Sequence, residues 1–295
     1  MTASVLFDAP GPRTRAWTAA GNVLGTLVVL GIAAWVLVQL DSKGQLAPEL
    51  WADAVSARTW QYYLIPGLIN TLRAAAFAIV GSVLFGLVFG MGRLSQLALV
   101  RRVCGVVVEF LRAVPVLLMM VFFYGLFGQL LPGVPDKAFL AVVVALILYN
   151  GSVIAELVRS GVGNLPKGQS EAGLAIGLTP GQTLRSIQLP QALVAMLPAM
   201  VSQIVVVLKD SALGQLIGYA ELLRAGQIVY SADGNPLQVL TVVAIVFILL
   251  NLMLTVLAHQ LSRLLSSRTA GQTLEGTGIG NPTAIATPAE GPGKV

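Results

Sequence analysis

The chain has 295 residues, of which 56% are hydrophobic and only 11% are charged, and its mean hydropathy is +0.83. Soluble domains carry about 25% charged residues, so the composition indicates a protein that lies mostly in a membrane. The single cysteine, Cys104, excludes an internal disulfide and a metal site built from cysteines, and the single histidine, His259, argues against a histidine-based metal site. The net charge of +5 follows the membrane topology described below, so we expect no nucleic-acid partner.

Six apolar stretches are long enough to cross a bilayer, which takes about 20 residues as a helix. The sequence predicts an all-α fold, a polytopic membrane helix bundle with about six transmembrane helices, at 21–40, 66–92, 103–131, 138–158, 193–220 and 237–262. We expect a cytoplasmic arm at 1–20, a transmembrane domain at 21–265 and a disordered cytoplasmic tail at 266–295, which is rich in Gly, Pro, Thr and Ala. Two arginines before the first stretch also suit a signal peptide, but the stretch is long for one and no clear cleavage site follows it, which favours a retained helix.

Basic residues gather on one side of this arrangement. Of the 18 Lys and Arg residues, eleven lie in segments that are cytoplasmic if the N-terminus is inside, four lie in outer segments, and the rest lie within helices. Cytoplasmic segments of membrane proteins collect Lys and Arg. The charge split therefore predicts that both termini are cytoplasmic, and that the polar loop at 161–192 faces the cytoplasm.

The stretch 66–92 carries Ser82, Gly86 and Gly90 at four-residue spacing, on one helix face. Small residues at this spacing let membrane helices approach closely. The plainer interpretation is packing within the chain, and the alternative is contact with a second subunit. Arg73 lies near the predicted outer end of the same helix, where it either extends to the lipid headgroups or faces the transport pathway.

Polar side chains continue in the next two stretches. An unpaired charge inside a bilayer costs at least about 2–3 kcal/mol. Glu109 and Arg112 are three residues apart, as are Glu156 and Arg159, so each couple is expected to form a structural ion pair on one helix. Asn150 is expected to bond to a neighbouring helix, and it is also a candidate for the pathway.

The loop at 161–192 carries signals for helix starts and stops. Ser170 suits an N-cap, with Glu171 in the first turn that follows. Gly177 suits the left-handed residue that ends a helix, and Thr179 followed by proline suits a second N-cap. The loop is predicted to form two short helices joined at Gly177 that lead into the next span. The alternative is an ordinary polar connector.

A polar cluster lies in the outer part of the stretch 193–220. Adjacent residues do not share a helix face, so Lys209 and Asp210 are expected to have different partners. Pathway and structural roles both stay open for this cluster. The predicted substrate pathway consists of Arg73, Asn150, Lys209, Asp210 and Ser211.

Residues 171–190 read Glu-Ala-Gly, three residues, Gly, nine residues, and Ile-x-Leu-Pro. This spacing resembles the EAA loop of ABC importer permeases, with Gly173 in place of the second alanine. Further segments are similar to motifs of the polar amino-acid permeases, although Ala113-Val114 replaces the usual Gly-Thr. They are Pro66-Gly67-x-x-Asn70-Thr71-Leu72, Glu109-Phe110-x-Arg112-x-x-Pro115 and Leu208-Lys209-Asp210-Ser211. The resemblance covers residues 60–265.

The resemblance implies a type I ABC importer permease fold in a bacterial plasma membrane. It also implies a second permease subunit, two cytoplasmic ATP-binding cassette subunits, an external substrate-binding protein and a polar amino acid as substrate. The additional first helix and tail favour a heterodimer of permeases over a homodimer. The residues implied to couple the permease to the ATPase are Glu171, Ala172, Gly173, Gly177, Ile187, Leu189 and Pro190.

The chain lacks the Gly-x4-Gly-Lys-Ser/Thr loop that cradles ATP phosphates. We therefore expect a transport subunit rather than an enzyme, without a cofactor of its own, with ATP and Mg bound by the partner ATPase. The cations Arg73 and Lys209 suggest glutamate or aspartate as substrate. The rival hypotheses are a secondary transporter driven by an ion gradient, for which related halves and broken helices are not evident, and a membrane scaffold or channel subunit.

Overall fold

The computed structural model describes residues 11–275, and among them it contains helices and no strands. This confirms the predicted all-α class. Two helical segments are of π type, η1 (Trp60–Leu64) and η2 (Leu184–Gln188), and η3 (Ser211–Ile217) is a 3₁₀ helix. The α-helices are α1 (Pro12–Ser42), α2 (Pro48–Ala54), α3 (Ala57–Thr59), α4 (Ile65–Arg93), α5 (Ala98–Ala113), α6 (Val116–Leu130), α7 (Lys137–Gly163), α8 (Lys167–Ala175), α9 (Pro180–Thr183), α10 (Leu189–Asp210), α11 (Leu222–Asp233) and α12 (Pro236–Glu275).

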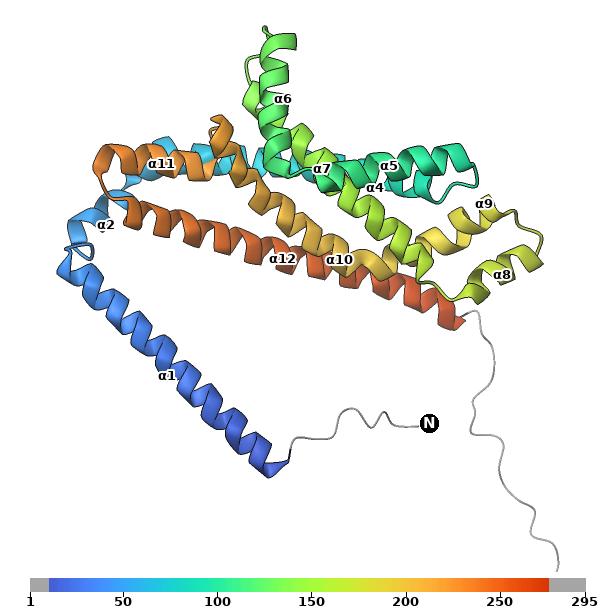
Figure 1. Ribbon diagram of the computed structural model, residues 1–295, viewed down its shortest axis with the longest axis horizontal. Helices are drawn as coiled ribbons and strands as arrows, with labels where there is room; N and C mark the ends of the chain where they lie inside the picture. Colours follow the sequence, from blue (N-terminus) through green and yellow to red (C-terminus); the bar gives the residue numbers. More distant parts are fainter. Residues whose placement is uncertain (1–10, 276–295) are drawn as a thin grey trace, which may run out of the picture.

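Within these residues, five helical rods are long and apolar enough to cross a membrane, and a sixth span exists only if α5 and α6 are counted together. The span predicted at 103–131 is broken into two helices, because α5 and α6 meet at an angle of 99°. The break lies at Val114, whose ψ of 125° is extended, followed by Pro115, the N-cap of α6. Proline disfavours helical backbone in the residue before it and has no N–H to donate. Figure 1 shows α6 rising steeply across the direction of α4, α5 and α12 as a result.

The centre of the bundle is the long contact between α4 and α7. A Cβ added to Gly86 would lie 2.4 Å from Ile154, and one added to Gly90 would lie 2.8 Å from Val158. Ser82 is fully buried and donates to the Leu146 carbonyl at 3.2 Å. The small residues at four-residue spacing therefore serve packing within the chain, since they let α4 and α7 approach closely.

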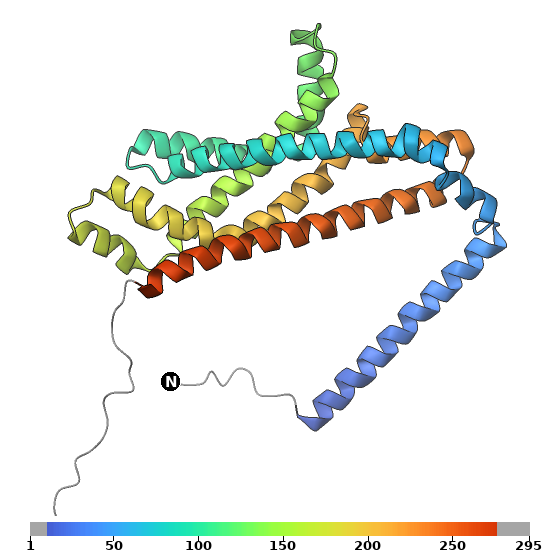
Figure 2. The ribbon, with the colours of Figure 1, turned by 180° about the vertical axis from the view of Figure 1, so that it is seen from behind.

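Helix α1 diverges from the rest of the bundle (Figures 1 and 2). Its C-terminal end leads into a turn and α2, which are attached to the start of α12: Gln238 donates to the Gln45 carbonyl at 2.6 Å, and Asn235 donates to the Leu50 carbonyl at 3.1 Å. Helix α1 begins at Pro12, so its first turns occupy part of the predicted arm at 1–20, and residues 1–10 lie outside the described part. Likewise α12 continues to Glu275, into the predicted tail at 266–295, of which only 266–275 is described.

Candidate functional site

The loop between α7 and α10 folds into a compact elbow (residues 161–192). Gly177 has a φ of +87°, a conformation that L side chains rarely adopt. Its N–H donates to the Leu174 carbonyl at 3.0 Å, and the N–H of Leu178 donates to the Gly173 carbonyl at 3.1 Å. These two bonds are the Schellman arrangement that satisfies the last carbonyls of a helix. The prediction that two short helices join at Gly177 is confirmed.

The second half of the elbow begins with a capping box. Thr179 accepts from the N–H of Gln182, and the Gln182 side chain accepts from the N–H of Thr179 at 2.8 Å. Pro180 occupies the first helical position, as predicted. From there α9, η2 and α10 follow one another without a break.

The start of α8 differs from the prediction. The helix begins at Lys167, with Pro166 as the N-cap and the N–H of Gln169 donating to the Pro166 carbonyl at 3.0 Å. Ser170 is therefore inside the helix and caps nothing, and Glu171 lies in the second turn. Proline is already restricted to a φ that suits a helix start, and it fixes the first turn before Ser170 is reached. Glu171 is exposed on the surface of the elbow.

The seven predicted coupling residues divide into two groups. Gly173 is buried against the second half of the elbow, where an added Cβ would lie 2.6 Å from Thr183 and 3.1 Å from Ile187. Thr183 thus occupies the space of the missing alanine side chain, which explains the departure from the motif. Four of the seven hold the elbow together or lead it into α10; they are Gly173, Gly177, Ile187 and Leu189.

The other group lies on the surface and is available to a partner. Glu171, Ala172 and Pro190 are exposed. Sequence reasoning missed two apolar side chains in the same place: Ile176 is 76% exposed and Leu174 is 47% exposed. A large apolar residue in a polar loop, directly before the glycine that ends its helix, was the signal that could have found them.

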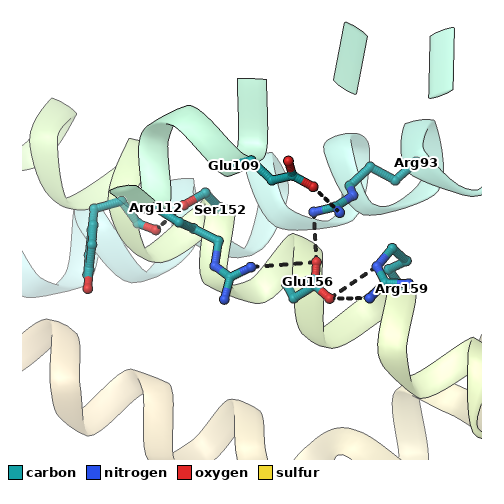
Figure 3. A network of polar contacts seen from close by, with 7 residues as sticks. Arg93, Glu109, Arg112, Ser152, Glu156 and Arg159 are labelled. Atoms are coloured by element: carbon teal, nitrogen blue, oxygen red, sulfur yellow. Dashed lines mark hydrogen bonds and ion pairs between the residues drawn. The ribbon is translucent and has the colours of Figure 1, made fainter. Parts of the chain in front are cut away.

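Five charged residues from α4, α5 and α7 form one network (Figure 3). Glu156 accepts from Arg159, as predicted, with Arg159 Nε at 3.1 Å. The predicted pair of Glu109 with Arg112 is wrong. Glu109 instead accepts from Arg93 at 3.3 Å, while Arg112 lies 3.7 Å from Glu156.

Arg93 is the residue that sequence reasoning left out of this network. Its side chain is 10% exposed, and its two terminal nitrogens contact Glu109 and, at 2.7 Å, Glu156. The guanidinium has several donors in a planar fork, so one arginine can join two carboxylates on different helices. The close approach of α4 to α7 brings Arg93 between them, and this proximity decides the pairing over the three-residue spacing on α5.

Arg73 has two partners within the chain. It lies 3.7 Å from Asp136, the N-cap of α7, and its guanidinium is 4.1 Å from the centroid of the Phe139 ring. Because α3, η1 and α4 form one continuous rod from Ala57 to Arg93, Arg73 lies near the middle of that rod. An ion pair and a cation–π contact there tie α4 to the start of α7.

The remaining pathway candidates have different surroundings. Asn150 is fully buried, and its Oδ1 accepts from Gln203 of α10 at 2.6 Å, which confirms the expected bond across helices. Ser211 is also fully buried and donates to the Leu208 carbonyl at 2.7 Å. Asp210 is half-buried at the end of α10, and Lys209 is exposed, with no acidic oxygen within 4.0 Å among the described residues.

A second group of polar contacts ties the start of α11 to the first turns of α4. Glu221 is fully buried and caps α11, accepting from the N–H groups of Leu223 at 2.8 Å and Arg224 at 2.7 Å. Burial raises the pKa of Glu221 to about 7, although the two N–H bonds act in the opposite direction. Thr71 of α4 accepts from the N–H of Leu222 at 3.0 Å. Sequence reasoning did not single out Glu221.

The sequence profile of the "Binding-protein-dependent transport system inner membrane component" family matches residues 51–267. The match includes α4 to α11, the elbow and most of α12. The chain belongs to this family. The permease fold expected from the spacing of the elbow is therefore confirmed, and α1, which precedes the matched residues, is an addition to the part that defines the permease family.

Two named permeases and one solved structure are similar to this chain. It is 45% identical to the glutamate transport system permease protein of Corynebacterium glutamicum, over 80% of this chain and 86% of that one. It is 32% identical to the glutamine transport system permease protein of Escherichia coli, over 68% and 91% of the two chains. A crystal structure of an amino acid ABC transporter with histidines matches with a TM-score of 0.62 at 30% identity, covering 68% of this chain and 92% of that one.

Proposed function

We propose that this permease imports a polar amino acid, glutamate in the first place, across a bacterial plasma membrane with energy from ATP. The observation that carries the proposal is the 45% identity to a glutamate permease over 80% of the chain. The glutamine permease and the amino acid transporter with histidines support the wider substrate class. In this proposal the chain pairs with a second permease subunit and receives its substrate from an external binding protein. A heterodimer is proposed because α1 lies outside the family match.

The elbow is the proposed contact with the cytoplasmic ATPase subunits, which hold the ATP and Mg. Its exposed residues Leu174 and Ile176 offer an apolar surface to an apolar groove, and the carboxylate of Glu171 offers a charge to a basic side chain. A partner at this place gains from removing apolar surface from water, by about 25 cal/mol per Å². Since α9, η2 and α10 are continuous, closure of the ATPase pair would turn α10 and re-orient the bundle, which is the alternating-access mechanism.

The orientation of the chain is part of the proposal. Both termini and the elbow would face the cytoplasm, as the distribution of Lys and Arg indicates. Reporter fusions at residues 45 and 135 should then read as external and a fusion at residue 175 as internal. An external reading at 175 would contradict the contact with the ATPase.

The substrate and the energy source are tested together by uptake into proteoliposomes. The complete complex, with its binding protein, should take up radiolabelled glutamate only when ATP is present, and unlabelled glutamate should compete better than other amino acids. Uptake driven by an ion gradient without ATP would favour a secondary transporter. Absence of any amino-acid uptake, with the complex intact, would favour a scaffold or channel subunit.

A further inference from the structure

A groove lies between the elbow and the turn that joins α4 to α5, and its volume is about 390 Å³. Figures 1 and 2 both show this turn at the same end of the bundle as α8 and α9. One wall belongs to α4, the turn and α5, and the other belongs to α9, η2 and α10. We call this feature the elbow groove. It is built from two parts of the chain that lie more than 80 residues apart.

Two arginines lie at the groove without carboxylate partners. Arg185 is exposed and lines the groove from η2. Arg101 is also exposed, and one of its terminal nitrogens donates to the carbonyl of Ser95, a lining residue, at 2.9 Å. Neither guanidinium has an acidic oxygen within 4.0 Å among the residues with described side chains. A guanidinium has five N–H donors, so both arginines keep donors for an anion.

The inside of the groove is mainly apolar. Its apolar lining residues come from both walls, and they are Met91, Leu94, Val100, Leu184 and Leu189. Removing such surface from water is favourable, but a small soluble anion would contact only the arginines and would leave these side chains uncovered. An occupant that uses the whole groove therefore combines an anionic group with a hydrocarbon chain.

The position of the groove also favours a lipid. The apolar span Pro48–Arg93 ends beside it, and the span Pro180–Ile217 begins there. On the adjoining α5, Leu99 and Val103 are exposed next to the exposed Arg101 and Arg102. Exposed apolar side chains and arginines on one helix are typical of a helix at a lipid surface, and basic pockets between membrane helices bind anionic lipid headgroups.

We propose that the elbow groove binds an anionic phospholipid. Its phosphate lies between Arg101 and Arg185, and one acyl chain lies along Val100 and Leu184. Because the two walls belong to different parts of the chain, the bound lipid joins the elbow to the turn between α4 and α5. This proposal adds a lipid to the proposed importer and does not depend on which amino acid is carried, so its test measures lipid binding instead of transport.

The test measures binding of phosphatidylglycerol to the purified complete complex by native mass spectrometry. A variant with both Arg101→Gln and Arg185→Gln should raise the Kd of the most tightly bound lipid by about tenfold or more, because two charge-assisted contacts are lost. Val100→Trp, which fills the groove and keeps both arginines, should also raise this Kd. Arg15→Gln replaces an exposed arginine at the start of α1, outside the groove, and is the matched control with an unchanged Kd. A Kd unchanged in the double variant would overturn the proposal.

Hydrogen exchange shows whether the lipid lies in the groove. Phosphatidylglycerol should slow the exchange of backbone amides in residues 94–97 and in residues 184–189 of the wild type, because it joins the two walls. In the double variant neither segment should respond. If both proteins respond alike, the lipid binds elsewhere and the proposal is refuted.

Two further ligands separate the parts of the recognition. Phosphatidylcholine has the acyl chains without a net charge, and glycerol 3-phosphate has the anionic group without the chains, so each should bind at least tenfold more weakly than phosphatidylglycerol. Equal binding of glycerol 3-phosphate would make the groove a phosphate site, and equal binding of phosphatidylcholine would show that the arginines are not used. Either result refutes the proposal. Absence of amino-acid uptake by a complex that binds phosphatidylglycerol in this way would count against the proposed function alone.

Discussion

The elbow at 161–192 and the charge network of Arg93, Glu109, Arg112, Glu156 and Arg159 are held together in opposite ways. In the elbow, each turn is fixed by residues a few positions apart: Leu178 bonds back to Gly173, and Gln182 bonds back to Thr179. In the network, Arg93 contacts carboxylates on two other helices. The comparison teaches that local chemistry determines the shape of the elbow, whereas the network depends on how closely α4 and α7 pack.

The largest effect is expected from overfilling the elbow. Gly173→Val places atoms where Thr183 already lies, 2.6 Å from the first added carbon, and should push α8 away from η2. Stimulation of ATP hydrolysis by the loaded binding protein should be almost abolished, with membrane insertion intact. Gly168→Val lies in the same helix with no atom within 4 Å of the added carbon, and it should keep most of the stimulation. Equal loss in both variants would show that helix propensity, not packing, is responsible.

The next effect distinguishes the two glutamates of the network. Glu156→Gln leaves Arg93, Arg112 and Arg159 without their shared partner, and we expect a loss of about 2 kcal/mol in stability. Glu109, whose side chain is 70% exposed, has one partner, so Glu109→Gln should cost about 0–1 kcal/mol. Thermal unfolding in detergent compares the two variants. Similar losses would contradict the central place of Glu156.

A smaller effect is expected from backbone strain alone. Gly177→Ala adds a side chain at a φ of +87° with no neighbour within 4 Å, which should cost about 1–2 kcal/mol. The elbow should loosen, and stimulated ATP hydrolysis should fall in part. Gly181→Ala also meets no neighbour but lies in α9 without a positive φ. If that control loses as much activity as Gly177→Ala, the left-handed turn is not the cause.

The smallest effect concerns the buried Glu221 at the start of α11 and its dependence on pH. The pKa of Glu221 in the folded protein, about 7, is raised above the ordinary value of 4.5. Its contribution to stability is therefore complete below pH 4.5 and is lost as the pH rises through 7. Between pH 6 and 8 the wild type should lose about 1 kcal/mol of stability from this group, and Glu221→Gln should not. If the stability of the wild type and of Glu221→Gln changes with pH in the same way, the titration of Glu221 is not the cause.

The parts of the fold that sequence could predict are those with local causes. Gly177 and the Thr179-Pro180 step each carry their own conformational preference, and both are as predicted. Ser170 was mistaken for a cap because a second start signal, Pro166, lies just before it. Pro115 could have indicated the 99° bend, but the uniform hydropathy of residues 103–131 suggested one uninterrupted span.

The parts that sequence could not predict depend on distant segments. Asp136 pairs with Arg73 only because the turn before α7 lies beside the middle of α4. Gln203 meets Asn150 because α10 crosses α7, and Lys209 shares a groove with Asn251 of α12. No spacing within one helix indicates such partners, since they are chosen by packing between helices.

Cross-linking from Ile176 is the most direct test of the central claim that the elbow contacts the ATPase. The sequence has one cysteine, Cys104, so Ile176→Cys in a Cys104→Ser background places a single thiol on the exposed tip of α8. A short bifunctional reagent should join this thiol to the ATPase subunit and stop ATP hydrolysis, whereas Gly133→Cys, in the turn between α6 and α7, should form no such product. A thiol at 176 that reacts equally with and without the ATPase, and joins to nothing, would contradict the claim.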